Sequence, residues 1–461
     1  MFLDRARSVR RDFNADPDTL QSIVERLDGL PLAIELAAAR VTVLSGKNLL
    51  ERLSAQLMLD GPGRRDPAKR HATLRQALDW SWELLDEVER DALAQCSVFC
   101  GGFSVDAAEE VLLLEGNNAP LQVLESLRSK SLIRKSAPLA GEDRYDLYQS
   151  VREYAADKSR VEPIGSMAGI EERHSEFFLD VGRRWWRAIH GPSGTVSLRH
   201  LARERGNLQA VFERTLSSTP ATAAWVALYL DGLFAIRGPR GTHRRVLDAA
   251  IEVGESLEPT IMVRLLRARG DAHRVWGDLE LARGDLQTAV DLLANHPHRW
   301  LEAQVTGSLA ILDFFEGRSE LGRQGCHRAI ALDDEVGNRI HEGLMRMALG
   351  IMLRRGGDDE GAVEQMGLAL ALHRRTGSQQ FEGASRINLG NLLRAQGRSA
   401  ESEEMYLEAL TLLRRLEDHR AAATVLGNLG SLTAIGGQFS RAKAYFAEAL
   451  HEGAKGLGSP E

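Results

Sequence analysis

The stretch LGNLLRAQGRSAESEEMYLEAL, residues 389–410, decides the fold because its pattern returns at a fixed interval. Leu-Gly pairs begin at residues 349, 389 and 429, so the interval between successive pairs is constant. A second glycine follows seven residues after the glycine of each pair, at Gly357, Gly397 and Gly437. Within the quoted copy, Tyr406 and Ala409 supply one bulky and one small residue. A period this regular indicates a protein built from repeats.

The pattern within each copy favours two antiparallel helices. Small residues let the helices approach closely, and the bulky residue fills the space beside them. The second glycine can end the first helix by adopting a left-handed conformation. Because one such hairpin cannot bury its apolar face alone, neighbouring hairpins must stack. We therefore predict a mainly α fold whose residues 259–458 form an α-solenoid.

The order Leu-Gly, Gly, small, bulky, Ala resembles the tetratricopeptide repeat, although a 40-residue period exceeds the usual 34 of that family. The resemblance implies a protein or peptide ligand on the concave face. The residues expected to line this face are Phe314, Ile351, Arg354, Asn391 and Arg394. The arginines and the asparagine could hold a carboxylate through charge-assisted hydrogen bonds. The alternative is that they are solvated polar residues of a helix surface.

Upstream, residues 77–160 predict three helices and a β-hairpin. The third helix is expected near residues 121–129, and the strands at 131–135 and 144–148. Three helices followed by a two-stranded wing predict a winged helix-turn-helix. Residues 165–258 are expected to form a helical linker and an atypical first repeat.

Several sequence motifs characterise this region. LDWSWELLDEVER, SVFCGGFSVDAAEEV and YDLYQSVREYA occur in one order, and ERGNL follows at 204–208. These motifs resemble the winged-helix segment and linker of bacterial STAND ATPases, over about residues 1–255. The resemblance implies a domain that packs against a nucleotide module and senses its state.

The run DGLPLAIELAAAR, residues 28–40, has a local structural reason. Gly29 suits the end of one helix, and Pro31 suits the first turn of the next. The run also resembles the helical domain of NB-ARC modules, which implies that Gly29, Leu30 and Pro31 would contact the adenine of ADP or ATP. Residues 1–58 are then a remnant of that domain. The positions that match the companion Met-His-Asp-like triplet of that family hold Leu147, Tyr148 and Gln149 here, so the histidine that would meet the nucleotide phosphate is absent.

A phosphate-binding loop requires Gly-x4-Gly-Lys-Ser/Thr. The nearest match, around Gly46-Lys47, has Val41 in place of the first glycine and Asn48 in place of the hydroxyl residue. We therefore expect no ATP hydrolysis and no cofactor for this chain alone, and ADP or ATP only where a nucleotide core is supplied. That core is expected on a separate chain or upstream of Met1.

Composition narrows the partners. The net charge is −7, which disfavours nucleic acid and acidic membranes as general partners. Arg128 and Lys130, in the third helix of the winged-helix region, are the candidate DNA contacts, and residues 59–76 form a basic linker. Three cysteines and the absence of a signal-peptide pattern at residue 1 point to the cytoplasm.

The leading hypothesis is a non-catalytic, signal-sensing arm of a STAND-type regulator that binds a ligand on its repeats. A stand-alone repeat scaffold is the alternative from a different class. A transcription factor that binds DNA through the winged helix is the third hypothesis.

Overall fold

The computed structural model describes residues 1–27, 29–57, 67–115, 119–139, 142–161, 167–254 and 257–457. This part of the chain is mainly α, as predicted, with 24 α-helices and three short strands. It divides into two compact units. The first unit comprises Met1–Asp180 and Arg203–Val211, and the second comprises Val181–Ala202 and Phe212–Glu461. Each unit is described by itself.

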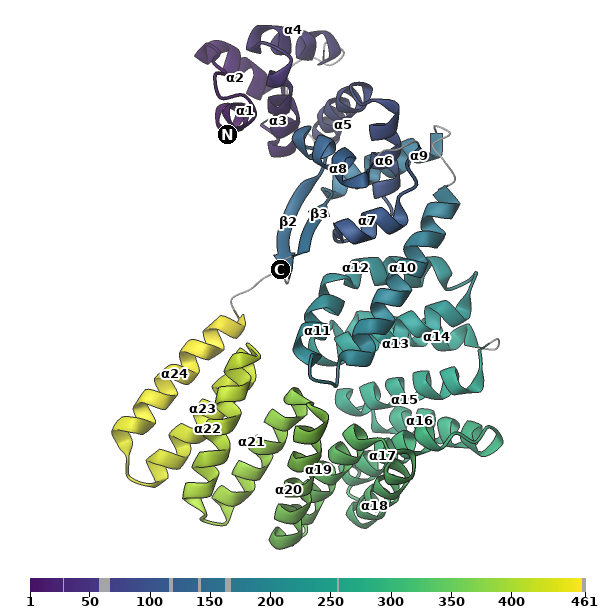
Figure 1. Ribbon diagram of the computed structural model, residues 1–461, viewed down its shortest axis with the longest axis vertical. Coiled ribbons are helices and arrows are strands. Elements are labelled where there is room, and N and C mark those ends of the chain that lie inside the picture. Colours follow the sequence, from purple (N-terminus) through teal and green to yellow (C-terminus); the bar gives the residue numbers. More distant parts are fainter. Residues whose placement is uncertain are drawn as a thin grey trace. The chain divides into compact units, whose positions relative to one another are not determined.

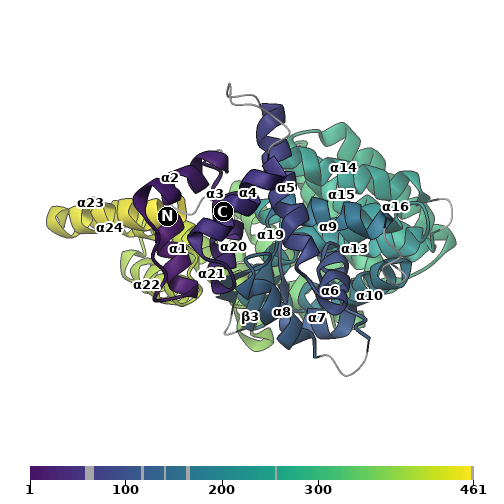
Figure 2. The ribbon, with the colours of Figure 1, turned by 90° about the horizontal axis from the view of Figure 1, so that it is seen from above.

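The second unit is a solenoid of helical hairpins, drawn from teal to yellow in Figure 1. Its first helices are α15 (Pro259–Trp276), α17 (Arg299–Phe315), α19 (Arg339–Arg355), α21 (Gln379–Ala395) and α23 (His419–Ile435). Its second helices are α16 (Leu279–Asn295), α18 (Ser319–Val336), α20 (Asp359–Thr376), α22 (Ser399–Arg415) and α24 (Phe439–Leu457). The two helices of a hairpin lie side by side, as α23 and α24 do in Figures 1 and 2. The predicted solenoid is confirmed.

Turns between helices follow the predicted glycines. Gly357 has φ +86° between α19 and α20, and the N–H of Asp358 donates to the carbonyl of Leu353, which ends α19. The turns between hairpins use the same conformation at Gly337 and Gly377. One period after Gly377, Glu417 takes this role with φ +55°, so a side chain is accommodated where the neighbouring turns have none.

Close helix packing depends on a size match within each hairpin. A methyl group added to Gly350, Gly390 or Gly430 would lie 2.7–2.9 Å from the side chain of Met366, Tyr406 or Phe446, respectively. The glycine belongs to the first helix of the hairpin, and the bulky residue stands at the same register position of the second helix each time. In the hairpin α17–α18 the corresponding positions hold Ala310 and Cys326, both buried in one cluster. In this hairpin alanine replaces the glycine of the first helix, and the residue opposite it is the smaller cysteine instead of methionine, tyrosine or phenylalanine.

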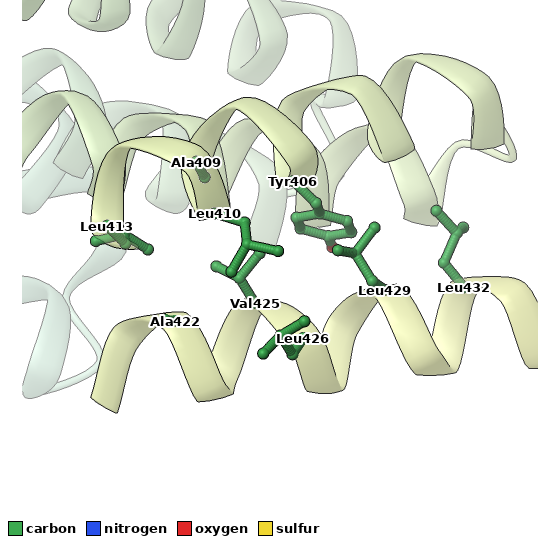
Figure 3. Packing of buried hydrophobic residues seen from close by; sticks show 9 residues of the cluster. All are labelled: Tyr406, Ala409, Leu410, Leu413, Ala422, Val425, Leu426, Leu429 and Leu432. Atoms are coloured by element: carbon green, nitrogen blue, oxygen red, sulfur yellow. The ribbon is translucent and has the colours of Figure 1, made fainter. Parts of the chain in front are cut away.

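Neighbouring hairpins share a hydrophobic core. Between α22 and α23, Tyr406 and Leu410 face Val425 and Leu429, all of them at most 4% exposed (Figure 3). The row of leucines along both helices in this view explains why one hairpin alone would leave an apolar face in water.

Residues 189–199, which we name the corner segment, join α10 (Met167–Ala188) to α11 (Gly194–Arg203) and pack against distant repeat turns. The hydroxyl of Ser378 donates to the carbonyl of His190, and the His190 ring stacks on Phe381 at 5.2 Å. Arg199 forms an ion pair with Glu417 at 2.6 Å. The corner segment therefore fixes both turns that follow α20 and α22.

The first unit begins with four helices, α1 (Phe2–Val9), α2 (Pro17–Arg26), α3 (Pro31–Ala38) and α4 (Gly46–Leu57), and a 3-10 turn η1 (Ala39–Thr42). Asp16 caps α2, since its carboxylate accepts the N–H of Thr19 at 2.8 Å. Gly29, at φ +65°, separates α2 from α3, and Pro31 is the first residue of α3.

The helices α5 (Pro67–Glu83), α6 (Glu87–Cys96), α7 (Val105–Val111) and α8 (Pro120–Ser129) come next, together with a three-stranded antiparallel sheet of order β1-β3-β2 whose first strand lies between α6 and α7. The strands are β1 (Phe103–Ser104), β2 (Arg134–Leu139) and β3 (Glu142–Asp146), and α9 (Gln149–Val161) comes next. The hairpin strands are displaced by two to three residues from the predicted starts. The two-residue β1, which pairs with β3, has no alternation long enough to predict it.

The ERGNL motif, residues 204–208 at the start of α12 (Arg205–Thr215), forms hydrogen bonds and an ion pair with other segments of the first unit. The side chain of Asn207 accepts the N–H of Cys100 at 2.7 Å and donates to the carbonyl of Gly102 at 2.9 Å. Glu204, which is buried, forms an ion pair with the buried Arg144 of β3. Polar atoms that would otherwise be unsatisfied in the core are thereby paired.

In the described part of the chain, none of the helices combines the length and the apolar character that crossing a membrane requires.

Candidate ligand face and a basic cavity

The first helices of the second unit make up its inner side. Each one contacts the first helix of the next hairpin, as α15 does with α17 and α17 with α19. Contacts that skip the intervening second helix can form only on the inside of a curved stack. Side chains that project from the first helices between these contacts are therefore available to a ligand.

The predicted ligand residues occupy two equivalent positions of this face. Phe314, Arg354 and Arg394 share one register position of successive repeats, and Ile351 and Asn391 share another. Ile351 and Arg354 are exposed at the end of α19, where a ligand could reach them. Phe314 is half-buried, and the guanidinium of Arg355 lies over its ring at 5.0 Å.

Of the other two predicted residues, Asn391 is engaged within the repeats and Arg394 is partly buried. The side-chain oxygen of Asn391 accepts the hydroxyl of Tyr406 at 2.6 Å and the amide of Asn428 at 3.2 Å. The Nε atom of Arg394 is buried and has no hydrogen-bond partner among the described residues. Asn391 thus holds the hairpin together.

Sequence reasoning missed the arginines at the start of this face. Arg264, Arg267 and Arg274 of α15 stand one period before Gln304, Gly307 and Phe314 of α17. The repeat signal is weak there because Arg269 replaces the leucine of the Leu-Gly pair before Gly270. Arg269 is instead held by ion pairs with Asp248 and Asp285 at 3.0 and 2.7 Å. Counting back one period from Ala310 would have found the register.

The first unit contains a polar cavity of about 300 Å³. Four cations and one acid line it together with three further residues: Arg5, Glu35, Arg128, Ser131, Ile133, Arg134, Lys135 and Tyr148. The hydroxyl of Tyr148 donates to Glu35 at 3.3 Å, and Arg134 lies over the Tyr148 ring at 4.7 Å. Burial and the neighbouring Glu35 raise the pKa of Tyr148, so that its phenol is protonated at neutral pH.

This cavity brings together two segments that the sequence singled out separately. Glu35 belongs to the helix that follows Gly29, Leu30 and Pro31, and Tyr148 is the middle residue of the Leu147-Tyr148-Gln149 triplet. Gly29 and Pro31, which come shortly before Glu35 in the sequence, are exposed, and Leu30 is the N-cap residue of α3. None of these three lines the cavity.

Both candidate DNA contacts take part in ion pairs. Arg128 pairs with Glu125 at 2.6 Å, and Lys130 pairs with Glu89, whose side chain is 7% exposed. A phosphate would have to compete with these carboxylates. In the predicted basic linker, residues 58–66 lie outside the described residues, and Arg75 pairs with Asp157 at 3.8 Å.

Comparison with known families identifies the repeats. A family model described as "Tetratricopeptide repeat" matches residues 382–450. A Mycobacterium tuberculosis protein named "Putative HTH-type transcriptional regulator" is 33% identical over 224 residues, which are 46% of this chain and 24% of that protein. An uncharacterized protein of the same species is 37% identical over 166 residues, which are 34% of this chain and 42% of that protein. The chain thus covers less than half of either relative.

Two solved structures are similar to this chain. One is a signal transduction ATPase with numerous domains (STAND) and a tetratricopeptide repeat sensor from Pyrococcus horikoshii, at 15% identity and a TM-score of 0.47, covering 99% of this chain and 66% of that one. The other is a Rap protein complexed with competence and sporulation factor, at 13% identity and a TM-score of 0.46, covering 62% and 78%. Residues 382–450 of this chain thus match the tetratricopeptide repeat, and its mycobacterial relatives include a protein named as a regulator.

Proposed function

We propose that this chain is the signal-sensing arm of a STAND-type signal-transduction regulator and has no catalytic activity of its own. The observation that carries the proposal is the hydrogen bond of 3.3 Å between Tyr148 and Glu35. It joins the segment that resembles the helical domain of that family to the position that matches its Met-His-Asp-like triplet, beside a cavity lined by four cations and one acid. A phosphate of a nucleotide supplied by another part of the machine would compete there with Glu125 and Asp146, which pair with Arg128 and Arg134.

In this proposal residues 77–160 act as a winged-helix domain and residues 1–58 as the remnant of a nucleotide-module helical domain. The helices α6–α8 and the hairpin β2–β3 support the first assignment. The left-handed Gly29 and the first-turn Pro31 support the second, since they leave the corner exposed to a nucleotide core. Residues 59–76 would be the linker, and residues 165–258 would connect to the repeats at 259–458.

The repeats would bind a protein or peptide on the inner side of their first helices, in the cytoplasm. Ile351 and Arg354 are exposed there, and Phe314 stands at the register position of Arg354 one repeat earlier. A ligand changes an off/on equilibrium only to the extent that it binds the two states differently. The chain would therefore link an occupied repeat face to the packing of its first unit on a nucleotide core.

The test uses the purified full-length chain and a native lysate. The chain alone is expected to release no phosphate from ATP. Capture followed by crosslinking is expected to enrich a chain that carries Gly-x4-Gly-Lys-Ser/Thr. The variant Glu35→Arg should recover less of it, whereas Glu25→Arg, an exposed acid of α2, should behave like wild type.

Two results would contradict the proposal. ATP turnover that disappears when a residue of this chain is substituted would show a catalytic protein. Equal recovery of one set of partners by wild type and Glu35→Arg, without any nucleotide-binding chain among them, would favour a stand-alone repeat scaffold.

A further inference from the structure

Arg264 of α15 is a cation without a carboxylate partner. Its guanidinium carbon lies 4.8 Å from the ring centre of Trp300 and 5.8 Å from that of Trp225. Within the described residues, no Asp or Glu lies at ion-pair distance from it. Nearly every other arginine of the first helices in this part of the unit is neutralised, as Arg267 and Arg274 are by Asp271. A half-buried, unpaired guanidinium is costly unless something compensates it.

The surroundings of Arg264 disfavour its charge, which an acidic ligand would compensate. Burial and the nearby Arg267 lower the pKa of Arg264 to about 10, so it still carries its charge at neutral pH. The atoms packed around His190 and the positive Arg267 lower the pKa of His190 to about 4, although part of His190 meets solvent. His190 is therefore neutral at pH 7 and offers ring nitrogens without adding a charge.

Polar atoms beside this arginine also lack partners. The Nε atom of Arg267 and the side-chain oxygen of Gln304 are buried without a hydrogen bond in the described part of the chain. Gln304 stands at the position of the next first helix that corresponds to Arg264. Buried donors and acceptors of this kind can pair with the polar groups of a ligand.

The aromatic residues make a rigid frame. Trp186 of α10 contacts Trp225 and Tyr229 of α13 (Pro220–Arg237), with ring centres 6.2 and 5.7 Å apart. The Arg264 guanidinium lies within 6 Å of two tryptophan rings, which restricts where it can move, and its N–H groups lie in the plane of the group. That fork matches the two oxygens of a carboxylate.

We propose that Arg264, framed by Trp225 and Trp300, binds an acidic group of a peptide that lies along the first helices. This inference rests on the proposed ligand-binding function of the repeats and specifies its chemistry. Asn388 and Asn428 share one register position on α21 and α23, further along the same helices. One N–H of each amide donates within the repeats, to Met347 at 3.3 Å and to Asn391 at 3.2 Å, which leaves the second N–H of each amide for a ligand. Amides at this interval suit the backbone of an extended peptide, whereas a small free anion would use the arginine alone.

The test measures the fluorescence anisotropy of a labelled decapeptide of alternating Asp and Leu with the full-length chain. Its Asn-Leu analogue and inorganic phosphate serve as competitors. The acidic peptide is expected to bind wild type, and Arg264→Gln should weaken it by at least about tenfold, because a charge-assisted bidentate contact is lost. Arg264→Lys, which keeps the charge but not the fork, should fall between them.

Arg240→Gln is the matched control. Arg240 also lies over a tryptophan, Trp276 at 5.2 Å, but Asp278 already pairs with it at 3.1 Å. This variant should bind the peptide as wild type does. Circular dichroism establishes that each variant is folded.

Three results would overturn the inference: equal affinity for the acidic peptide and its Asn-Leu analogue, no loss in a folded Arg264→Gln variant, or competition by phosphate as strong as that of the peptide. The last result would assign a general oxyanion site. If Arg264→Gln loses the peptide and wild type recovers no nucleotide-binding chain, the ligand site stands and the STAND role fails. If the chain is recovered but no peptide binds, the reverse holds.

Discussion

Replacing Gly390 by alanine is expected to destabilise the solenoid, although alanine is the better helix former. The added methyl group would lie 2.7 Å from Cε1 and 2.9 Å from Cδ1 of Tyr406. The Tyr406 ring is fully buried, and its hydroxyl donates to Asn391 at 2.6 Å, so the ring cannot move aside without losing that bond. The first helix α21 and the second helix α22 would have to separate.

The size of the effect follows from two opposing contributions. Alanine in place of a helical glycine gains about 0.5–1 kcal/mol, and overpacking a filled core costs about 1–3 kcal/mol. The net loss therefore lies between about 0 and 2.5 kcal/mol, with a midpoint of about 1 kcal/mol. In a Tyr406→Cys background the pair copies Ala310 and Cys326 of the hairpin α17–α18. The ring is then absent, and the same Gly390→Ala change should gain about 0.5–1 kcal/mol.

The assay is a double-mutant cycle by chemical denaturation, with hydrogen exchange on α21 and α22 because repeat proteins can unfold in parts. Gly427→Ala is the control on the neighbouring first helix, where the added carbon meets no atom within 4 Å. It should be stabilising. If Gly390→Ala has the same effect with Tyr406 and with cysteine at 406, the size match does not explain the packing.

Three further predictions concern single side chains. Burial lowers the pKa of His373 from 6.5 to about 4, so between these two pH values only the unfolded chain binds the proton, and stability falls as the pH drops. From pH 7.5 to pH 5 the free energy of unfolding should fall by about 2 kcal/mol. His373→Leu should remove this pH dependence in denaturant titrations. Glu417→Gly should raise the thermal midpoint, because relieving a left-handed residue gains about 1 kcal/mol and the exposed pair with Arg199 contributes less than that; a lower midpoint would mean that the pair dominates. Glu204→Gln should cost about 3–5 kcal/mol in chemical unfolding, since the buried Arg144 loses its counter-charge, and a change under about 1 kcal/mol would contradict the buried pair.

The repeats could be predicted because their packing is local in sequence. Gly390 and Tyr406 lie on the two helices of one hairpin, so a single copy contains both members of the match and the other copies repeat it. The same periodicity identifies which side of a helix a residue occupies, and Ile351 and Arg354 are exposed where expected. It does not reveal which side chains are already engaged. Asn391 was therefore assigned to a ligand, although Tyr406 uses it.

Contacts between distant segments could not be predicted. The bond from Ser378 to the carbonyl of His190 joins residues 188 positions apart, and no periodicity connects them. Arg264 escaped notice for a related reason, because its importance comes from Trp225 and Trp300 on two other helices. The cavity beside Glu35 and Tyr148 likewise depends on two residues that stand 113 positions apart.

The division into two units has a practical consequence for experiments that shorten the chain. Boundaries between the units fall inside α10 and α12. The chain leaves the first unit after Asp180, enters the second unit for Val181–Ala202, and returns to the first unit for Arg203–Val211. A carboxy-terminal fragment that begins after Asp180 lacks Cys100 and Gly102, so the amide of Asn207 loses its backbone partners. A carboxy-terminal fragment that begins after Val211 instead lacks the corner segment, which contacts the turns at Ser378 and Glu417. Residues 1–211 contain the whole first unit together with Val181–Ala202 of the second, and residues 181–461 contain the whole second unit together with Arg203–Val211 of the first. No single truncation therefore isolates one unit without part of the other, so each unit is best studied by substitution within the full chain or by rejoining its two pieces in one engineered polypeptide.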